Sequence, residues 1–424
     1  MSQSQPKKVL IFSLTYYPKY VGGAEVAIKE ITDRIAPGDI AFDMITLRFD
    51  SALPEEERIG NVMVYRIGPT KKDPQMDELV RFPMYLIKVL YPLLAAWKAF
   101  RLNQEKHYDG AWAMMSYMGF PIIILRAFFF TKLPYVLTLQ EGDSIEHVTK
   151  RWRIRIVHFL YAPVYRLPRI VQTISTYLAD WARAMGYKGE LVVVPNAVDT
   201  AYFSREFSDK ELNVLRERLG KKAGERFIIT TSRLVAKNAV DIVIRSLEYL
   251  PETVKFLVLG VGPDEAKLRK LATGLGLSRR VLFLGHIDRM EMPKYLKVSD
   301  VFVRPSRSEG MGISFVEAMA AGIPVVATAI GGITDFLFDP KQNPDKEPTG
   351  FFVNVEDPKD TARAIKEFLE DETLRERCVE NAKRMVKGEY DWNLIAKNMR
   401  EKVFAALFLP AIQGERRPKV SPWF

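Results

Sequence analysis

The chain has 424 residues, of which 48% are hydrophobic and 27% are charged. The length exceeds one ordinary hydrophobic core and predicts two domains of about 150–200 residues each, and the composition excludes a disordered chain. The net charge of +10 is spread over both halves of the chain. The single cysteine, Cys378, excludes an intrachain disulfide and favours a reducing, cytoplasmic setting.

The first half of the chain alternates short apolar runs with helical patterns, and its N-terminus shows no secretory signal. The glycine loop YYPKYVGG (16–23) separates the first expected strand from the first expected helix. Strands are expected at 7–14, 42–47, 61–67, 110–115, 134–140, 169–175 and 190–199, and helices at 24–36 and 176–186. The apolar region 79–100 is broken by two prolines and three cations, so we predict that it does not span a membrane.

A second alternating series begins at residue 226. Strands are expected at 226–232, 254–260, 281–285, 300–306 and 324–330, with helical patterns between them. Strands that are apolar from end to end and separated by helices are typical of parallel sheets covered on both faces. We therefore predict an α/β fold with two Rossmann-like domains, 1–198 and 199–390, followed by a periodic helix within 391–410 and a tail, 411–424.

The richest candidate site follows the strand at 300–306, in the stretch RPSRSEGMGISFVEAMAAG. Gly310 and Gly312 allow the backbone to approach a ligand, and the helix that starts near Ile313 offers free N–H groups to a phosphate. Glu309 on the loop and Glu317 inside the helix are hydrogen-bond acceptors that suit vicinal hydroxyl groups. Two diols joined by a diphosphate describe a nucleotide-sugar.

The segment TTSRLVAKN supplies the cations that a diphosphate needs. Arg233 can grip a phosphate with two hydrogen bonds, and Lys237 adds a point charge. The alternative is that both are solvated surface charges. The segment GVGPDE contributes Gly262 as a turn near the ligand, although a lone G-x-G-P is weak evidence of a dinucleotide site.

Other chemistries fit the sequence less well. The four histidines have no metal-ligand spacing, and neither H-E-x-x-H nor C-x-x-C is present, so we expect no metal and no cofactor. A glycosidase needs two acids that face each other across a sugar. Glu309 and Glu317 lie on one loop and the helix that follows it, which suits that geometry poorly.

The stretch SEGMGISFVEAMAAGIPVVAT resembles the E-x7-E signature of the retaining family 4 glycosyltransferases (glycosyl transferases group 1), which have the GT-B architecture. YYPKYVGGAEVAIKEI, VVVPNAVD, SRLVAKN, GGITDFL and the helix after EYDW resemble further segments of that family, in the same order. The resemblance covers nearly the whole chain. It implies two Rossmann-like domains that face each other across a cleft, with the helix at 391–410 crossing back to the N-terminal domain.

The resemblance also implies a role for each matching residue. Glu309 and the backbone of the next three residues would hold the donor sugar, Glu317 the ribose, and Arg233 with Lys237 the leaving diphosphate. Ile287 would lie near the base, and Gly22 would line the acceptor side. The implied donor-binding set is Gly23, Gly262, Ile287, Gly310, Met311, Gly312, Ile313 and Glu317, beside the catalytic Arg233, Lys237 and Glu309.

Two positions depart from the family pattern. Gln140 stands where the family often has histidine, so the sugar contact has changed or Glu141 or Asp143 replaces it. Asp335 stands where the G-G-x-x-E segment has glutamate, and one methylene less shortens its reach. Neither departure is expected to abolish activity.

The sequence therefore predicts a retaining, metal-independent hexosyltransferase. It would use a UDP- or GDP-linked sugar and a glycan or lipid-linked acceptor in cell-envelope polysaccharide or glycolipid synthesis. A nucleotide-sugar 2-epimerase and a non-catalytic nucleotide-sugar-binding protein are the alternatives.

Three stretches, 79–100, 125–134 and the basic, aromatic 150–169, indicate peripheral binding to an anionic membrane surface on the cytoplasmic side. The alternative is that their aromatic residues pack internally. No motif supports binding to nucleic acid.

Overall fold

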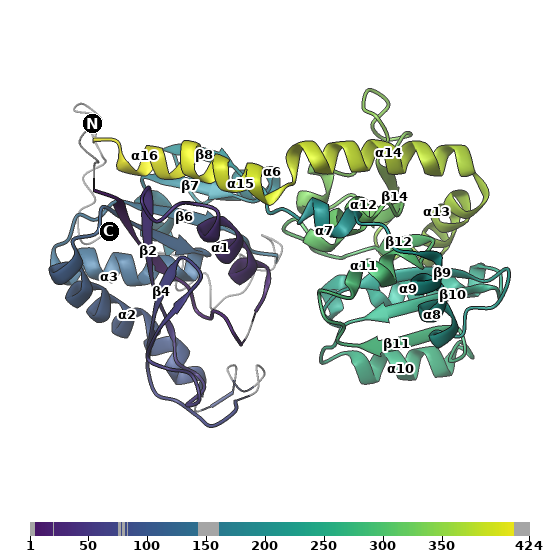
Figure 1. Cartoon of the computed structure of the whole chain (residues 1–424), viewed down its shortest axis with the longest axis horizontal. Coiled ribbons are helices and arrows are strands. Elements are labelled where there is room, and N and C mark those ends of the chain that lie inside the picture. The colour runs from purple at the N-terminus through teal and green to yellow at the C-terminus, as the bar shows by residue number, and fades with distance from the viewer. Residues whose placement is uncertain are drawn as a thin grey trace.

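The computed structural model describes residues 5–19, 21–74, 78, 81–82, 84–142 and 161–410. These residues form two lobes, each built on one sheet (Figure 1). The N-terminal lobe is purple and blue in Figure 1, and the C-terminal lobe is teal and green. The predicted α/β fold with two Rossmann-like domains is confirmed.

The N-terminal sheet has the strand order β3-β4-β2-β1-β5-β6-β7-β8. Its strands are β1 (Lys7–Phe12), β2 (Ile40–Leu47), β3 (Glu56–Ile59), β4 (Val62–Ile67), β5 (Gly110–Met114), β6 (Tyr135–Leu139), β7 (Ile170–Thr173) and β8 (Glu190–Val193). The helices of this lobe include α1 (Gly23–Asp33), α2 (Met84–Lys106), α3 (Gly119–Phe129) and α6 (Thr176–Ala184), with the short η2 (Ser116–Met118). All pairings are parallel except β3 with β4. The sequence EERI of β3 was not expected as a strand, because it is short, charged and lies at the sheet edge.

The C-terminal sheet is parallel throughout, in the order β11-β10-β9-β12-β13-β14. Its strands are β9 (Arg226–Thr231), β10 (Val254–Leu259), β11 (Val281–Gly285), β12 (Val301–Arg304), β13 (Val325–Thr328) and β14 (Gly350–Val353). Its helices are α7 (Thr200–Ser204), α8 (Asp209–Arg218), α9 (Val240–Ser246), α10 (Glu265–Gly274), α11 (Met292–Lys297), α12 (Ile313–Ala321), α13 (Pro358–Glu370) and α14 (Glu372–Glu389), with the short η3 (Ala236–Asn238), η4 (Leu247–Tyr249) and η5 (Gly331–Asp335). The apolar strands are buried between the helices, as two-sided coverage requires.

The chain passes between the lobes twice, and the two passages are bonded to each other. Val198 N–H donates to the Tyr390 carbonyl oxygen at 2.9 Å. After the second passage come α15 (Trp392–Asn398), the π-helical η6 (Met399–Phe404) and α16 (Ala405–Phe408), shown in yellow along the N-terminal lobe in Figure 1. Phe404 packs its ring 5.3 Å from Trp112 and 5.6 Å from Phe42, between ring centroids. The expected single helix is therefore interrupted by a π-helical segment where it packs on the N-terminal sheet.

Helix α2 corrects the expectation that prolines break the region 79–100, because it continues through Pro92. Proline has no N–H to donate to the carbonyl four residues earlier, which belongs to Lys88. Tyr117 takes that place, since its hydroxyl donates to the Lys88 carbonyl oxygen at 2.6 Å. The proline is therefore tolerated because a side chain satisfies the carbonyl that it leaves free. No helix among the described residues is long and apolar enough to cross a membrane.

This compensation can be tested with a double-mutant cycle. Tyr117→Phe should lower the free energy of unfolding by about 1–2 kcal/mol, because a half-buried carbonyl loses its donor. In the Pro92→Ala background the same change should cost much less, since the alanine introduced there can supply an N–H to the Lys88 carbonyl. Urea denaturation followed by circular dichroism measures both costs, with the exposed Tyr85→Phe as control. Equal costs in the two backgrounds would contradict the explanation.

Candidate active site

Three loops of the C-terminal lobe meet where the neighbouring strands β10, β9 and β12 end. Leu234 N–H donates to the Val261 carbonyl oxygen at 3.0 Å, and Arg307 N–H donates to the Lys237 carbonyl oxygen at 2.7 Å. Gly262 lies in the loop after β10, against the Leu234 backbone. The loop that carries Lys237 is thus hydrogen-bonded to the two neighbouring loops. It lies at the carboxyl ends of the strands, where parallel sheets bind ligands.

Glu309 is held by a guanidinium that the sequence analysis did not identify. Arg304, at the end of β12, is buried and donates from Nη2 to Glu309 Oε2 at 2.8 Å and from Nη1 to Ser314 Oγ at 2.7 Å. Its guanidinium also lies 4.1 Å from the centroid of the Phe315 ring. A buried guanidinium that loses its carboxylate is costly, so this pair fixes the orientation of Glu309. Within the described chain no hydrogen bond engages Glu309 Oε1, which leaves that oxygen for a ligand.

The start of α12 depends on a glycine. Gly312 has φ +88°, and a Cβ there would lie 2.6 Å from Phe315 Cδ2 and 2.7 Å from Arg304 Nη2. A larger residue would therefore be strained and would also disturb the guanidinium. Helix α12 begins at Ile313 without a side-chain cap, so its first N–H groups face the loop region as potential donors to an anion.

The N-terminal glycine loop lies against the start of α12. A Cβ on Gly23 would be 3.7 Å from Ile313 Cδ1. The loop is closed by Glu25, whose carboxylate accepts hydrogen bonds from Gly22 N–H at 2.9 Å and from Thr15 Oγ1 at 2.6 Å. Both predicted glycines of this loop are thus brought to the space between the lobes.

Glu317 is linked to the opposite lobe through Arg289. The Glu317 side chain is 15% exposed, and its Oε1 lies 3.8 Å from Arg289 Nε. Arg289 Nη1 in turn lies 3.7 Å from Glu30 Oε1 on α1. Burial raises the pKa of the Glu317 carboxyl above its usual value, while Arg289 and Arg304 act in the lowering direction. Arg289 therefore lies between two carboxylates and connects Glu317, which is predicted to bind the ribose, to the N-terminal lobe.

Lys237 meets the N-terminal lobe directly. Its Nζ donates to the Gly142 carbonyl oxygen at 3.3 Å, and Ser308 Oγ donates to the same oxygen at 2.8 Å. Arg233 is exposed, and its guanidinium makes no hydrogen bond or ion pair within the described part of the chain. Of the predicted cation pair, one member contacts a carbonyl of the facing lobe and the other is exposed to solvent.

The loop after β6 is anchored by amides and by Glu141. Gln140 and Asn196 form a reciprocal amide pair with N–O distances of 3.3 and 3.1 Å. Glu141 Oε1 accepts from Ser116 N–H at 2.7 Å, and its other oxygen accepts from Gln140 N–H at 2.9 Å. Burial raises the pKa of the Glu141 carboxyl, against the lowering effect of these bonds. Both side chains thus position the loop, while Asp143 lies outside the described residues.

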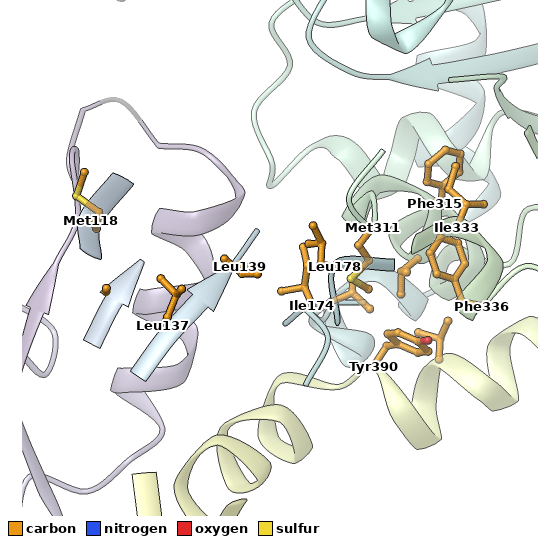
Figure 2. Packing of buried hydrophobic residues seen from close by; sticks show 14 of the residues in the cluster. Met118, Leu137, Leu139, Ile174, Leu178, Met311, Phe315, Ile333, Phe336 and Tyr390 are labelled. Atoms are coloured by element: carbon orange, nitrogen blue, oxygen red, sulfur yellow. The ribbon is translucent and has the colours of Figure 1, made fainter. Parts of the chain in front are cut away.

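Asp335 and Met311 bind the two lobes together beside the site. Asp335 Oδ2 accepts from Thr176 N–H at 2.8 Å at the start of α6, and its Oδ1 accepts from the Thr176 hydroxyl. Figure 2 shows Leu178 of α6 beside the buried Met311, with Ile333 close by. The side chain of Met311, whose backbone was predicted to hold the donor, therefore packs between the lobes.

Gly310 and Ile287 lie in different surroundings. Gly310 approaches the facing loop closely, since a Cβ there would come within 2.4 Å of the Glu141 carbonyl oxygen. Ile287 follows β11, is half-buried, and packs against the main core near Arg289. No group of three His, Cys, Asp or Glu side chains in the described ranges is arranged to hold a metal ion.

Sequence reasoning missed three residues of this site: Arg304, Arg289 and Gly142. An arginine at the end of the apolar strand DVFVRPS was a usable signal for Arg304, because arginine is rarely buried unless it is paired. No local pattern marked the other two, since their partners are distant in sequence: Gly142 contacts Lys237 and Ser308, and Arg289 lies between Glu317 and Glu30.

Two family models match the chain. The model described as glycosyl transferases group 1 matches residues 213–385, and the model described as glycosyltransferase family 4 matches residues 21–202. One matched segment carries Arg233, Lys237, Glu309 and Glu317, and the other begins at the end of the glycine loop and includes Gly22 and Gly23. The two models together account for most of both lobes.

Known proteins resemble the chain along nearly its whole length. An uncharacterised glycosyltransferase of Methanocaldococcus jannaschii is 26% identical over 413 residues, covering 92% of this chain and 96% of the relative. Sucrose-phosphate synthase from Thermosynechococcus elongatus matches with a TM-score of 0.77 and 20% identity, covering 94% of this chain and 100% of that chain. The crystal structure of Anabaena HepE in complex with UDP and glucose matches with a TM-score of 0.73 and 22% identity, covering 94% and 100%.

The solved structures share the arrangement of the two lobes, and the family models match the segments that form the site. The prediction from the E-x7-E stretch is confirmed at the level of family, fold and enzyme class. The chain belongs to the group 1, family 4 glycosyltransferases of the GT-B fold and is an enzyme of that class.

Proposed function

We propose that this enzyme is a retaining, metal-independent hexosyltransferase that uses a nucleotide-sugar, UDP- or GDP-linked. Its acceptor would be a glycan or a lipid-linked sugar in cell-envelope polysaccharide or glycolipid synthesis. The proposed setting is cytoplasmic, at the inner face of a membrane.

One observation carries this proposal. The loop with Lys237, the Glu309 loop and the first turns of α12 lie side by side on one sheet edge and face the loop after β6 of the other lobe. These elements offer the exposed guanidinium of Arg233, the ammonium of Lys237, the fixed carboxylate of Glu309 and the uncapped N–H groups at the start of α12. Together these suit a diphosphate flanked by two groups of hydroxyls.

In this arrangement Glu309 binds donor-sugar hydroxyls. Arg304 occupies Oε2, so Oε1 can accept a hydrogen bond from a sugar hydroxyl without reorienting the side chain. The Glu317 carboxylate would accept from the ribose diol, where its partner Arg289 lies at a weak 3.8 Å contact. Preformed acceptors of this kind reduce the ordering cost of binding.

The leaving diphosphate would be met by Arg233 and Lys237. Lys237 now contacts a neutral carbonyl at 3.3 Å, and a phosphate oxygen is a stronger partner for an ammonium than that carbonyl. Positive charge placed where negative charge develops lowers the barrier for departure of the diphosphate. In a front-face retaining reaction a donor phosphate oxygen helps to take the acceptor's proton, so the chemistry would need no separate protein base.

The donor-binding roles can be tested by substitution. Lys237→Ala and Glu309→Ala should each lower kcat/KM for transfer by about 100- to 1000-fold, the range for loss of one group that stabilises developing charge. Thermal shifts with UDP-glucose, GDP-mannose and ADP-glucose identify the donor base, because a ligand of the folded state raises the Tm. The exposed Lys210→Ala on α8 is the control. Full activity in both site variants would refute the assignment.

The metal independence and stereochemistry have their own test. Transfer should continue unchanged after dialysis against EDTA, because Arg233 and Lys237 supply the charge that a metal provides elsewhere. Proton NMR of the first-formed product should show the anomeric configuration of the donor. Loss of activity that Mg²⁺ or Mn²⁺ restores would contradict the first statement, and an inverted anomer the second.

The raised pKa of Glu317 predicts a pH dependence of donor binding. Only the ionised carboxylate can accept hydrogen bonds from both ribose hydroxyls. The Kd for the donor should therefore fall as the pH rises through that raised pKa. Arg289→Ala should move this transition to higher pH, since Arg289 acts to lower the pKa. Glu317→Gln should weaken binding and remove the transition.

The same carboxyl has an opposite effect on folding. Its pKa is higher in the folded than in the unfolded state, so its contribution to stability falls as the pH rises between the two values. Calorimetric titration with donor across pH measures the effect on binding apart from the effect on folding. The exposed Glu217→Gln is the control. A transition that survives in Glu317→Gln would show that another group titrates.

A further inference from the structure

Helix α2 exposes a continuous apolar face. Its opposite side is buried in the core through Tyr91, Ala95 and Ala99. The exposed side chains recur every three or four residues, which places them on one side of the helix. They are Phe82 just before the helix, then Tyr85, Leu86, Val89, Leu90, Leu93, Leu94 and Trp97.

The face extends onto α3, which packs beside α2 (Figure 1). Phe128 is 70% exposed and Phe130 is 85% exposed. Between them, Phe129 stacks on Phe100 at 4.6 Å and lies 5.9 Å from Trp97, between ring centroids. We call this combined surface the α2–α3 face. Globular proteins seldom expose so many large apolar side chains together unless the surface binds something.

Exposed cations outnumber acids around the α2–α3 face, where Glu105 at the end of α2 is exposed and Glu56 lies 3.6 Å from Lys98. Residues 79–104 contain no Asp or Glu, and neither do residues 110–140. Arg81, Arg101 and Lys132 are exposed on the same elements or next to them. Two copies of the chain that joined through this face would bring their cations together, which disfavours a dimer as the occupant.

We infer that the α2–α3 face docks the protein on an anionic lipid bilayer. The apolar side chains enter the boundary between headgroups and acyl chains, while the flanking cations contact anionic headgroups. The buried side of α2 stays against the sheet, so the helix lies in the plane of the membrane surface.

The face also reaches the edge of the active site. Tyr117 connects α2 to the loop after β5 through the Lys88 carbonyl, and the neighbouring Ser116 N–H donates to Glu141 beside the Lys237 contact. Docking would therefore hold the space between the lobes near the bilayer, where a lipid-linked acceptor lies. This consequence for the acceptor rests on the proposed function, whereas docking itself does not.

Of the aromatic residues of the predicted patch at 150–169, only Tyr161 and Tyr165 are among the described residues. Residues 150–160 lie outside the described residues. Tyr165 is buried, so it packs internally and is no part of a surface. The docking proposal therefore rests on α2 and α3 alone.

Co-sedimentation of the full chain with vesicles tests the proposal. Binding is expected with an equimolar mixture of phosphatidylcholine and phosphatidylglycerol, and much less with phosphatidylcholine alone. Leu93→Glu/Trp97→Glu should weaken binding at least about tenfold, because two immersed apolar groups become charged. Arg101→Glu/Lys132→Glu should weaken it by removing the electrostatic part, and Val214→Glu, which is 60% exposed on α8, should bind as the unmodified chain does.

Two outcomes would overturn docking. One is unchanged sedimentation of Leu93→Glu/Trp97→Glu with anionic vesicles. The other is a dimer in light scattering that this double variant dissociates, which would make a second copy the occupant. The Tm of each variant confirms folding, and its shift with UDP-glucose, GDP-mannose and ADP-glucose reports the donor site, so failure of the donor assignment is distinguished from failure of membrane docking.

Discussion

The site depends on one buried ion pair, between Arg304 and Glu309. The guanidinium lies at the end of an apolar strand, where hydrogen bonds to Glu309, Ser314 and the Thr231 carbonyl oxygen and the face of Phe315 compensate its desolvation. Because a lost partner would leave a buried charge, the loop between β12 and α12 has one strongly preferred conformation. That conformation needs the left-handed backbone of Gly312, so the glycine, the cation and the acid are parts of one constraint.

The same loop is held from the opposite lobe. The Gly142 carbonyl oxygen accepts hydrogen bonds from Ser308 of this loop and from the nearby Lys237. Met311 of the loop packs beside α6, and Arg289 lies between carboxylates of both lobes. Near the residues proposed to bind the sugar donor, the contacts between the lobes are few and polar. At Met311 the contact is apolar and buried. A ligand can therefore exchange with the Lys237 contact while the apolar bridge keeps the lobes in register. Ser308, Glu309 and Met311 lie on one loop, so the carboxylate proposed to bind the donor sugar is next to two residues that contact the facing lobe.

Local sequence patterns were sufficient to predict the two Rossmann-like domains, and the structure places the candidate site residues Lys237 and Glu309 at the strand ends. The patterns that carried this prediction were the apolar strands, the glycine loops and the order of cations and acids along the chain. The edge strand β3 and the continuous helix α2 were not predictable in the same way, since one lacks an apolar pattern and the other contains Pro92. Arg289 and Gly142 act through partners that are distant in sequence, and residue spacing carries no information about such contacts.

Asp335 shows how such a cross-lobe contact changes the meaning of a departure from a family pattern. Seen alone, the shorter acid suggested a weakened reach toward the donor. In the structure its carboxylate accepts both the N–H and the hydroxyl of Thr176, the first residue of α6, where a negative charge is favoured by the helix dipole. The lobes approach so closely here that a Cβ on Gly332 would come within 2.6 Å of Ser175 Cβ. Asp335 therefore bonds to Thr176 at a place where the two lobes are in close contact. The carboxylate is therefore used in the contact between the lobes, and its departure from the family pattern is explained by that contact rather than by reach toward the donor.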